Sequence, residues 1–318
     1  MSDSYYGRPI VKPHQWKPEV PAYFWIGGTA GAAAVGCTVA RIRGAHGLAR
    51  VFKRTALAGA LASPILLTLD LGVPLRFYNM FRVFKPTSPM NLGSWVLTAF
   101  GGALTASTLA ELCGVKAASV IGELAAAALG PVVTTYTAVL ISNTATPVWH
   151  EAYEGLPFVF IASGLAGAGA VGVLFAPPEE RGIARRAMVL GSLGMGAGMQ
   201  GMQVGLGPLL SEPYHEGKAG AMHGAATLLG LAGASLGVIG RKNRFVSSTA
   251  ALCTIAAGVL ERFTIFQAGK QSAQDPKYVV ESQRARLALR ALAHELPQHD
   301  ERGQESEHAE HRMEHHAQ

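Results

Sequence analysis

Apolar runs of about 20 residues recur along the whole chain and constrain its fold more than any other feature. An α-helix crosses the hydrocarbon core of a bilayer in about 20 residues. Because lipid offers no hydrogen-bond partner to an exposed backbone, such runs are helical. The sequence therefore predicts an all-α polytopic membrane protein of about eight transmembrane helices, at residues 22–40, 54–73, 94–113, 117–142, 157–176, 186–209, 219–239 and 246–267.

The composition agrees with burial in lipid. Charged residues make up 15% of the chain, against about 25% in soluble domains. The formal charge is +6, but the basic residues stand in short clusters between apolar runs, which argues against nucleic acid as a partner. We expect an extramembrane N-terminal segment at 1–21, a transmembrane domain at 22–268, and an extramembrane tail at 269–318 that begins as a helix and ends in disorder.

The charged loops predict an orientation. We call the side that holds the N-terminus face A and the opposite side face B. Loops on face A carry Arg76, Arg82, Lys85 and Lys218, whereas those on face B carry three times as many basic residues. By the positive-inside rule, face B is cytoplasmic and both termini lie outside.

The connection between the second and third predicted spans is the most unusual segment. Asp70 ends the second span, where a carboxylate needs a partner, and Arg76 and Arg82 are candidates. Two prolines make the path after them rigid, and Ser88 can cap the next helix. An aromatic belt at the membrane interface is one reading of this segment. A surface that docks a partner is the favoured one, through Arg76, Arg82, Lys85, Pro86, Thr87, Ser88 and Pro89.

Four stretches carry a resemblance to a known family. They are YYGRPIVKPHQWKPEVPAYFWIGGTAGAAA, LGVPLRFYNMFRVFKPTSPM, TTYTAVLISNTATPVWH and ERFTIFQAGKQSAQDP. Together they make the chain resemble the membrane subunits of the polysulfide reductase family (NrfD/PsrC type) over about residues 5–285. The second stretch and TYTAVLIS are the most specific.

The resemblance implies helix bundles of the NrfD/PsrC kind in a bacterial plasma membrane. It also implies a heme-free, quinone-reactive anchor subunit that passes electrons between the menaquinone pool and a ferredoxin-like [4Fe–4S] subunit, with a molybdopterin oxidoreductase beyond it. The residues agree, since the three cysteines stand alone and His223 is the one histidine clearly inside a span. We expect no heme, no iron–sulfur cluster and no metal site in this chain.

Candidate site residues are expected near face A, around one apolar cavity. By resemblance, Tyr136 of the TYT stretch contributes to the quinone pocket. Asp70 and Gln267 are further candidate quinone ligands, and Asp70, His150 and Glu261 are candidate proton-handling residues. Glu261 precedes Arg262, so a structural ion pair is an equal alternative for it.

Other polar residues inside the spans have modest expectations. His223 is read as a packed core histidine, and Gln200 and Gln203 as polar contacts between helices. Glu111 and Glu123 near face B are either a proton route or solvated helix ends. Two rival functions stay open, a secondary transporter and a passive anchor without quinone chemistry.

Overall fold

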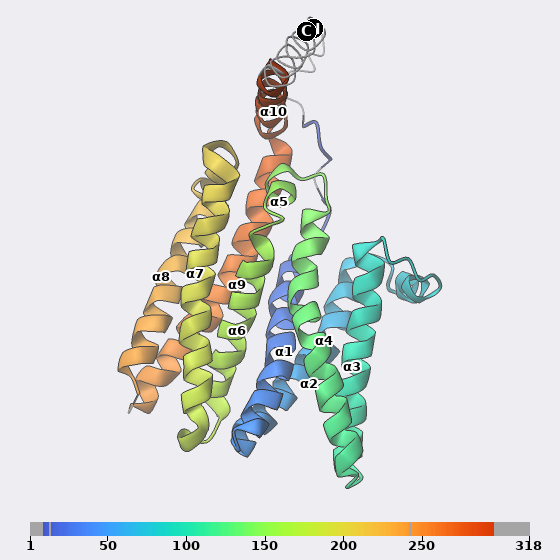
Figure 1. Ribbon diagram of the computed structural model, residues 1–318, viewed down its shortest axis with the longest axis vertical. Coiled ribbons are helices and arrows are strands. Elements are labelled where there is room, and N and C mark those ends of the chain that lie inside the picture. Colours follow the sequence, from blue (N-terminus) through green and yellow to red (C-terminus); the bar gives the residue numbers. More distant parts are fainter. Residues whose placement is uncertain (1–8, 13, 242, 296–318) are drawn as a thin grey trace, which may run out of the picture.

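Long helices running side by side make up the protein (Figure 1). The computed structural model describes residues 9–12, 14–241 and 243–295, and within these ranges the secondary structure is helical, without strands. The bundle is formed by α1 (Glu19–Ile42), α2 (His46–Asp70), α3 (Pro89–Leu112), α4 (Lys116–Ser142), α6 (Leu156–Phe175), α7 (Arg181–Ser211), α8 (Gly217–Ile239) and α9 (Arg244–Gln274).

Six of these helices are long and apolar enough to cross a membrane. The exceptions are α2, which passes the same test only together with the short helix η1 (Pro74–Phe81), and α7. The all-α, multi-pass membrane fold predicted from the sequence is confirmed. The count of eight spans stays a prediction, although each predicted span lies on one of the eight long helices.

The helices pack as two groups, α1–α4 and α6–α9. Within the groups α1 packs on α2 and α4, α6 on α7, and α8 on α9, and the groups meet where α1 and α4 face α6 and α9. Glycine permits the closest approaches. A Cβ on Gly130 of α4 would lie 2.5 Å from the carbonyl oxygen of Gly31 on α1, and one on Gly164 of α6 would lie 2.8 Å from that of Gly28. Small residues at such contacts are what helix association in lipid requires.

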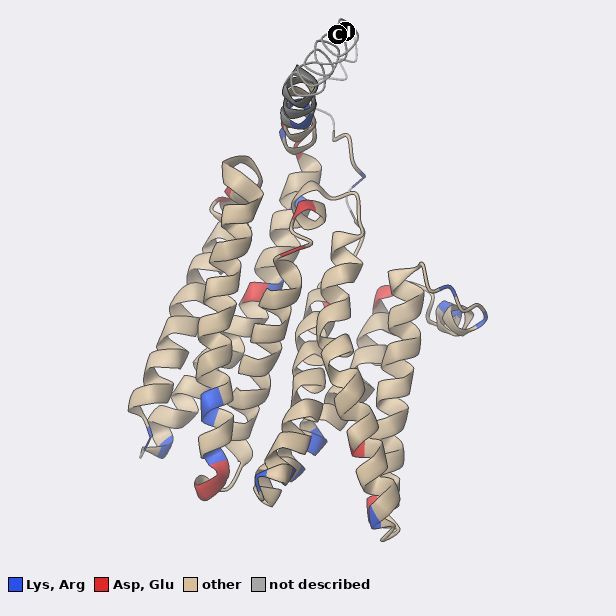
Figure 2. Ribbon diagram, viewed as in Figure 1, with Lys and Arg blue, Asp and Glu red and all other residues tan. Residues whose placement is uncertain are grey.

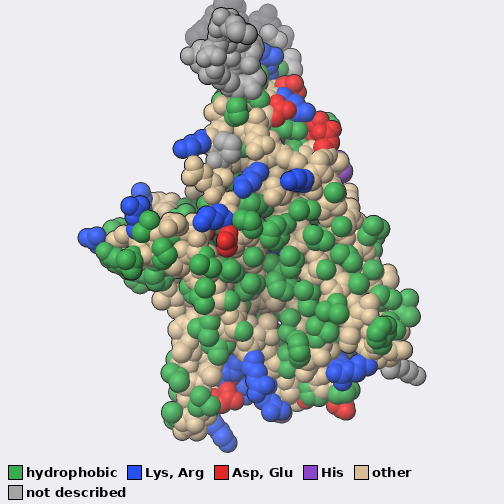
Figure 3. All heavy atoms as spheres, turned by 180° about the vertical axis from the view of Figure 1, so that it is seen from behind, with side chains coloured by type: hydrophobic (Ala, Val, Ile, Leu, Met, Phe, Trp, Pro, Cys, Tyr) green, Lys and Arg blue, Asp and Glu red, His purple; other side chains and the backbone are tan. Residues whose placement is uncertain are grey.

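Charged side chains gather at the two ends of the bundle (Figure 2), and much of the outer surface between them is apolar (Figure 3). Face A carries η1 and the short helices α5 (Pro147–Glu151) and η3 (Glu212–Tyr214). It also carries α10 (Lys277–Glu295), which projects beyond the bundle (Figure 1). Face B has short turns, two of them made by Gly44 and Gly114 in the left-handed region (φ 73° and 78°), and the helix η2 (Pro178–Glu180).

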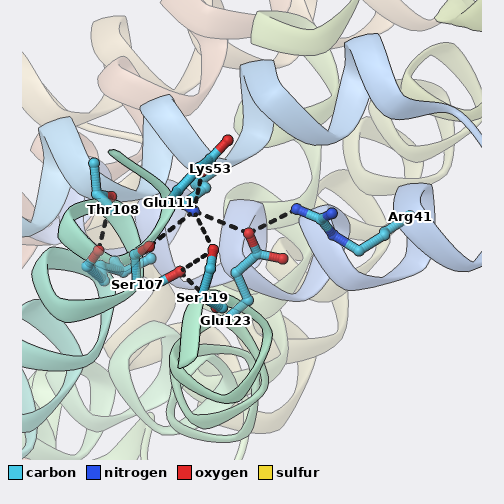
Figure 4. Close-up of polar contacts among 8 residues, drawn as sticks. Arg41, Lys53, Ser107, Thr108, Glu111, Ser119 and Glu123 are labelled. Carbon is cyan, nitrogen blue, oxygen red and sulfur yellow. Dashed lines mark hydrogen bonds and ion pairs between the residues drawn. The ribbon is translucent and has the colours of Figure 1, made fainter. Parts of the chain in front are cut away.

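A buried ionic network ties α1–α4 together near face B (Figure 4). The Lys53 ammonium of α2 lies 3.0 Å from the Glu123 carboxylate of α4, donates to Ser119 at 3.2 Å and contacts Glu111 of α3. Arg41 of α1 donates to the same Glu123 oxygen at 2.7 Å. Lys53 and Glu123 are buried. The structure thus assigns Glu111 and Glu123 to ion pairs between helices.

Candidate functional site

A cavity of about 210 Å³ lies between α7, α8 and α9. Its outer lining includes Leu193, Gly196 and Ala197 of α7 and Leu231 of α8, which are exposed on the outside of the bundle. The cavity therefore opens sideways, toward the lipid. Its inner lining combines two methionines with a polar set: Ser192, Gln200, His223, Thr227 and Glu261.

Glu261 is the most unusual residue of this lining. Its side chain is 2% exposed, and neither carboxylate oxygen accepts a hydrogen bond from any described residue. The Arg262 guanidinium comes within 3.5 Å of one oxygen. A carboxylate inside a membrane is costly unless it is paired and hydrogen-bonded. Glu261 thus presents unused acceptor capacity beside the cavity.

Arg262 faces away from the cavity, toward the other half of the bundle. It donates to the Phe160 carbonyl of α6 at 3.1 Å, and its guanidinium lies 3.5 Å from the centre of the Phe160 ring. Gly28 of α1 faces the same guanidinium. The arginine is thereby fixed on α6, by one hydrogen bond and a cation–π contact. The fixed positive charge stabilises an ionised Glu261 without filling the cavity.

His223 of α8 is half-buried on another wall of the cavity. Its Nε2 lies 3.2 Å from the Gln203 amide nitrogen of α7, which places the two within hydrogen-bonding distance. The His223 ring is 6.0 Å from that of His215, which is exposed on face A. His223 is six residues into α8, about 9 Å of helix rise. Titratable side chains therefore extend from the cavity to face A.

Comparison with known proteins agrees with this architecture. A model of the polysulfide reductase family, NrfD type, matches residues 2–275. The chain belongs to the NrfD family. No curated protein matches it. Family membership makes the chain a multi-pass membrane subunit of a redox complex that includes an iron–sulfur oxidoreductase, and the resemblance read from the sequence is confirmed.

In this NrfD-family subunit, Tyr136 lies in the other half of the bundle from the cavity. Its ring packs against Gly93 of α3, and its centre is 6.5 Å from that of the Tyr23 ring on α1. It is half-buried and packs at the edge of a hydrophobic core. Tyr136 therefore belongs to the contact between α1, α3 and α4, and its predicted role as a quinone ligand stays a prediction.

Asp70 does not pair with either arginine predicted for it. Its carboxylate accepts a hydrogen bond of 2.9 Å from the backbone nitrogen of Lys17, in the segment before α1. Arg82 instead comes within 3.5 Å of the Asn79 side chain. The expected pairing is wrong because η1 bends away from α2 by 115° and carries both arginines aside.

The remaining predicted residues also lie outside the cavity lining. His150 is exposed on α5, and its Nδ1 is 3.1 Å from the carbonyl oxygen of Ser142 at the end of α4. Gln267 is half-buried on α9, six residues beyond Glu261. Glu261 itself lies mid-helix, because α9 continues to Gln274, whereas the sequence placed it toward face A. The structure therefore brings one of the five predicted residues, Glu261, to this cavity.

The predicted docking residues follow α2 on face A. Arg76, Arg82, Lys85 and Pro86 are exposed, and Ser88 caps α3 by accepting from the Asn91 backbone nitrogen at 3.5 Å. The capping role expected of Ser88 is thus confirmed. Partner docking on Arg76, Arg82, Lys85, Pro86, Thr87, Ser88 and Pro89 stays a prediction.

The sequence reading missed the role of His223 and of the span-six glutamines. His223 lines a cavity instead of a packed core, and Gln203 lies beside its ring. The usable signal was polarity at membrane depth, since His223, Gln200 and Glu261 each interrupt an apolar run. Their positions on three helices gave no indication that they share one space.

Proposed function

We propose that this subunit exchanges electrons and protons between membrane quinol and an iron–sulfur partner docked on face A, and that the quinol ring binds in the cavity between α7, α8 and α9. One observation carries the proposal. Glu261 is a buried carboxylate without a hydrogen-bond partner, and it lines a cavity that opens toward lipid. The proposed quinol is menaquinol, and the proposed partners are a ferredoxin-like [4Fe–4S] subunit and a molybdopterin oxidoreductase.

The cavity suits a lipid-soluble ring with polar substituents. The exposed apolar residues at its mouth allow entry from the bilayer and leave room for a hydrocarbon tail. Met195 and Met199 provide a flexible apolar surface for a ring. Glu261 and His223 stand at the polar end, where they provide an acceptor and a titratable ring. Apolar walls with a few placed polar groups are typical of small-molecule sites.

Quinol oxidation releases two electrons and two protons. Glu261 accepts a hydrogen bond from a quinol hydroxyl and then its proton, while Arg262 holds the carboxylate ionised beforehand. His223 takes the other proton and passes it toward His215 and face A. The cavity thus separates the protons from the electrons, which leave through the partner's cluster. Quinone reduction would use the same residues in reverse.

The sequence-based alternative places the quinone near Tyr136, with Asp70, His150 and Gln267 around it. Substitution separates the two sites. We expect Glu261→Gln to lower quinol-linked turnover of the purified complex by about 10²-fold or more, the usual contribution of a proton-accepting group. Tyr136→Phe should leave turnover within about twofold. Glu216→Gln, which removes an exposed carboxylate on face A, is the matched control.

Co-purification of the partner subunits shows in each case that the complex assembles. Normal turnover in Glu261→Gln together with a loss in Tyr136→Phe would move the site to α4. Normal turnover in both variants would support a passive anchor.

A secondary transporter is favoured by one observation, the charged pair Glu261 and Arg262 in the middle of α9. Solute uptake by liposomes that contain this chain alone would replace the quinol proposal with this one.

A further inference from the structure

The segment between α2 and α3, residues 71–88, forms a lateral projection that we call the elbow. Gly72 adopts a left-handed conformation (φ 68°) just after α2, and η1 then runs at 115° to α2. Figure 1 shows η1 beside the face A ends of α2 and α3, pointing sideways from the bundle. Since α2 runs along the bundle axis, η1 lies close to the plane of the membrane surface.

The elbow exposes large apolar side chains. The exposed fractions are 81% for Leu75, 61% for Tyr78 and 61% for Phe84. Phe81 and Phe84 pack edge-on against Trp95 of α3, with ring centres 5.5 and 6.0 Å away. Figure 3 shows these apolar and basic side chains together on the projection. Exposed apolar surface of this extent marks a binding surface for a protein or a membrane.

The charge of the elbow has one sign. Arg76, Arg82 and Lys85 are exposed, and the sequence has no acidic residue between Asp70 and Glu111. A short helix in the membrane plane, with aromatic residues on one side and basic residues on another, is the pattern of an interfacial element that binds anionic lipid.

The elbow is also held in one shape. The Asn91 side chain accepts from the Lys85 backbone nitrogen at 2.7 Å and donates to the carbonyl oxygens of Met80 at 2.7 Å and Val83 at 2.9 Å. These bonds join both ends of the loop to the first turn of α3. The basic and aromatic side chains are therefore presented on a pre-ordered backbone.

We propose that the elbow binds anionic phospholipid, with its aromatic side chains in the acyl region and its three basic residues on the headgroup phosphates. A protein partner on face A is the competing occupant, and the geometry favours lipid. The elbow points outward in the plane of the membrane, whereas α10 projects from face A along the bundle axis (Figure 1). The proposal is independent of where quinol binds.

The test uses the whole complex in liposomes that carry photoactivatable phosphatidylglycerol or phosphatidylcholine, with labelled peptides mapped by mass spectrometry. We expect phosphatidylglycerol to label residues 71–88 several-fold more than phosphatidylcholine, since each basic residue near an anionic surface is worth roughly fivefold in affinity. The variant R76Q/R82Q/K85Q should lose this preference. The control R50Q/R54Q/R244Q removes the same charge from exposed residues on face B and should keep it.

Two results would overturn the proposal. One is equal labelling of residues 71–88 by the two lipids in the wild-type complex. The other is loss of the redox partner from R76Q/R82Q/K85Q with lipid labelling unchanged, which would make the elbow the docking surface predicted from the sequence.

Discussion

Lys53 is the residue on which the packing of α1–α4 near face B depends most. Replacing it with methionine keeps the apolar stem and removes a buried ammonium that bonds Glu123, Glu111 and Ser119 (Figure 4). Stranding a buried charge costs about 3–5 kcal/mol. The cost here lies at the low end, because Glu123 keeps Arg41 at 2.7 Å and the Glu111 side chain is 51% exposed. We expect Lys53→Met to lower the free energy of unfolding by about 3 kcal/mol.

A second substitution tests the reasoning. In Lys53→Met with Glu123→Leu, no buried charge is left without a partner, because Arg41 and Glu111 are 40% and 51% exposed and can be solvated. Apolar replacement of a buried ion pair is often neutral or stabilising. The double variant should therefore come within about 1 kcal/mol of the wild type.

The measurement is reversible unfolding of the purified protein in mixed micelles of increasing SDS content, followed by circular dichroism. Arg54→Met is the control, an exposed basic residue next to Lys53 on α2, and should change the free energy by about 0.5 kcal/mol or less. The reasoning is refuted if Lys53→Met behaves like Arg54→Met, or if the double variant loses at least as much stability as Lys53→Met.

Two further predictions concern packing and pH. A Cβ at Gly93 would lie 2.8 Å from the ring of Tyr136, so Gly93→Ala should cost about 1–3 kcal/mol in the same unfolding experiment; unchanged stability would mean that the ring moves freely. At the base of α10, the hydrogen bond from Lys277 lowers the pKa of Glu212 and raises that of Lys277. This contact is fully present above the unfolded pKa of Glu212, about 4.3, and is lost as the pH falls through the lowered folded pKa. Hydrogen exchange of residues 277–284 should therefore show constant protection between about pH 6 and 8 and less in acid; loss of protection in the neutral range would contradict the assignment.

The long helices follow from the sequence because each depends on local information. An apolar run in lipid must satisfy its own backbone, whatever its neighbours are. The predicted spans therefore fall on α1–α4 and α6–α9, even where the hydropathy of α7 is weak. The Ser88 cap was predictable for the same reason, since a cap involves residues three positions apart. Helix ends were less predictable, as α9 continues to Gln274.

The site depended on which side of each helix faces its neighbours. Nothing in the order of residues indicates that His223, Gln203 and Glu261 face a common space, or that Tyr136 turns toward Gly93 and Tyr23. Likewise, the partner of Asp70 lies 53 residues away in the chain, and the nearby arginines point elsewhere. Helix rotation is set by packing between elements that are distant in sequence. The sequence alone thus determined a helical membrane protein and its family, and the tertiary structure decided which buried polar residues meet.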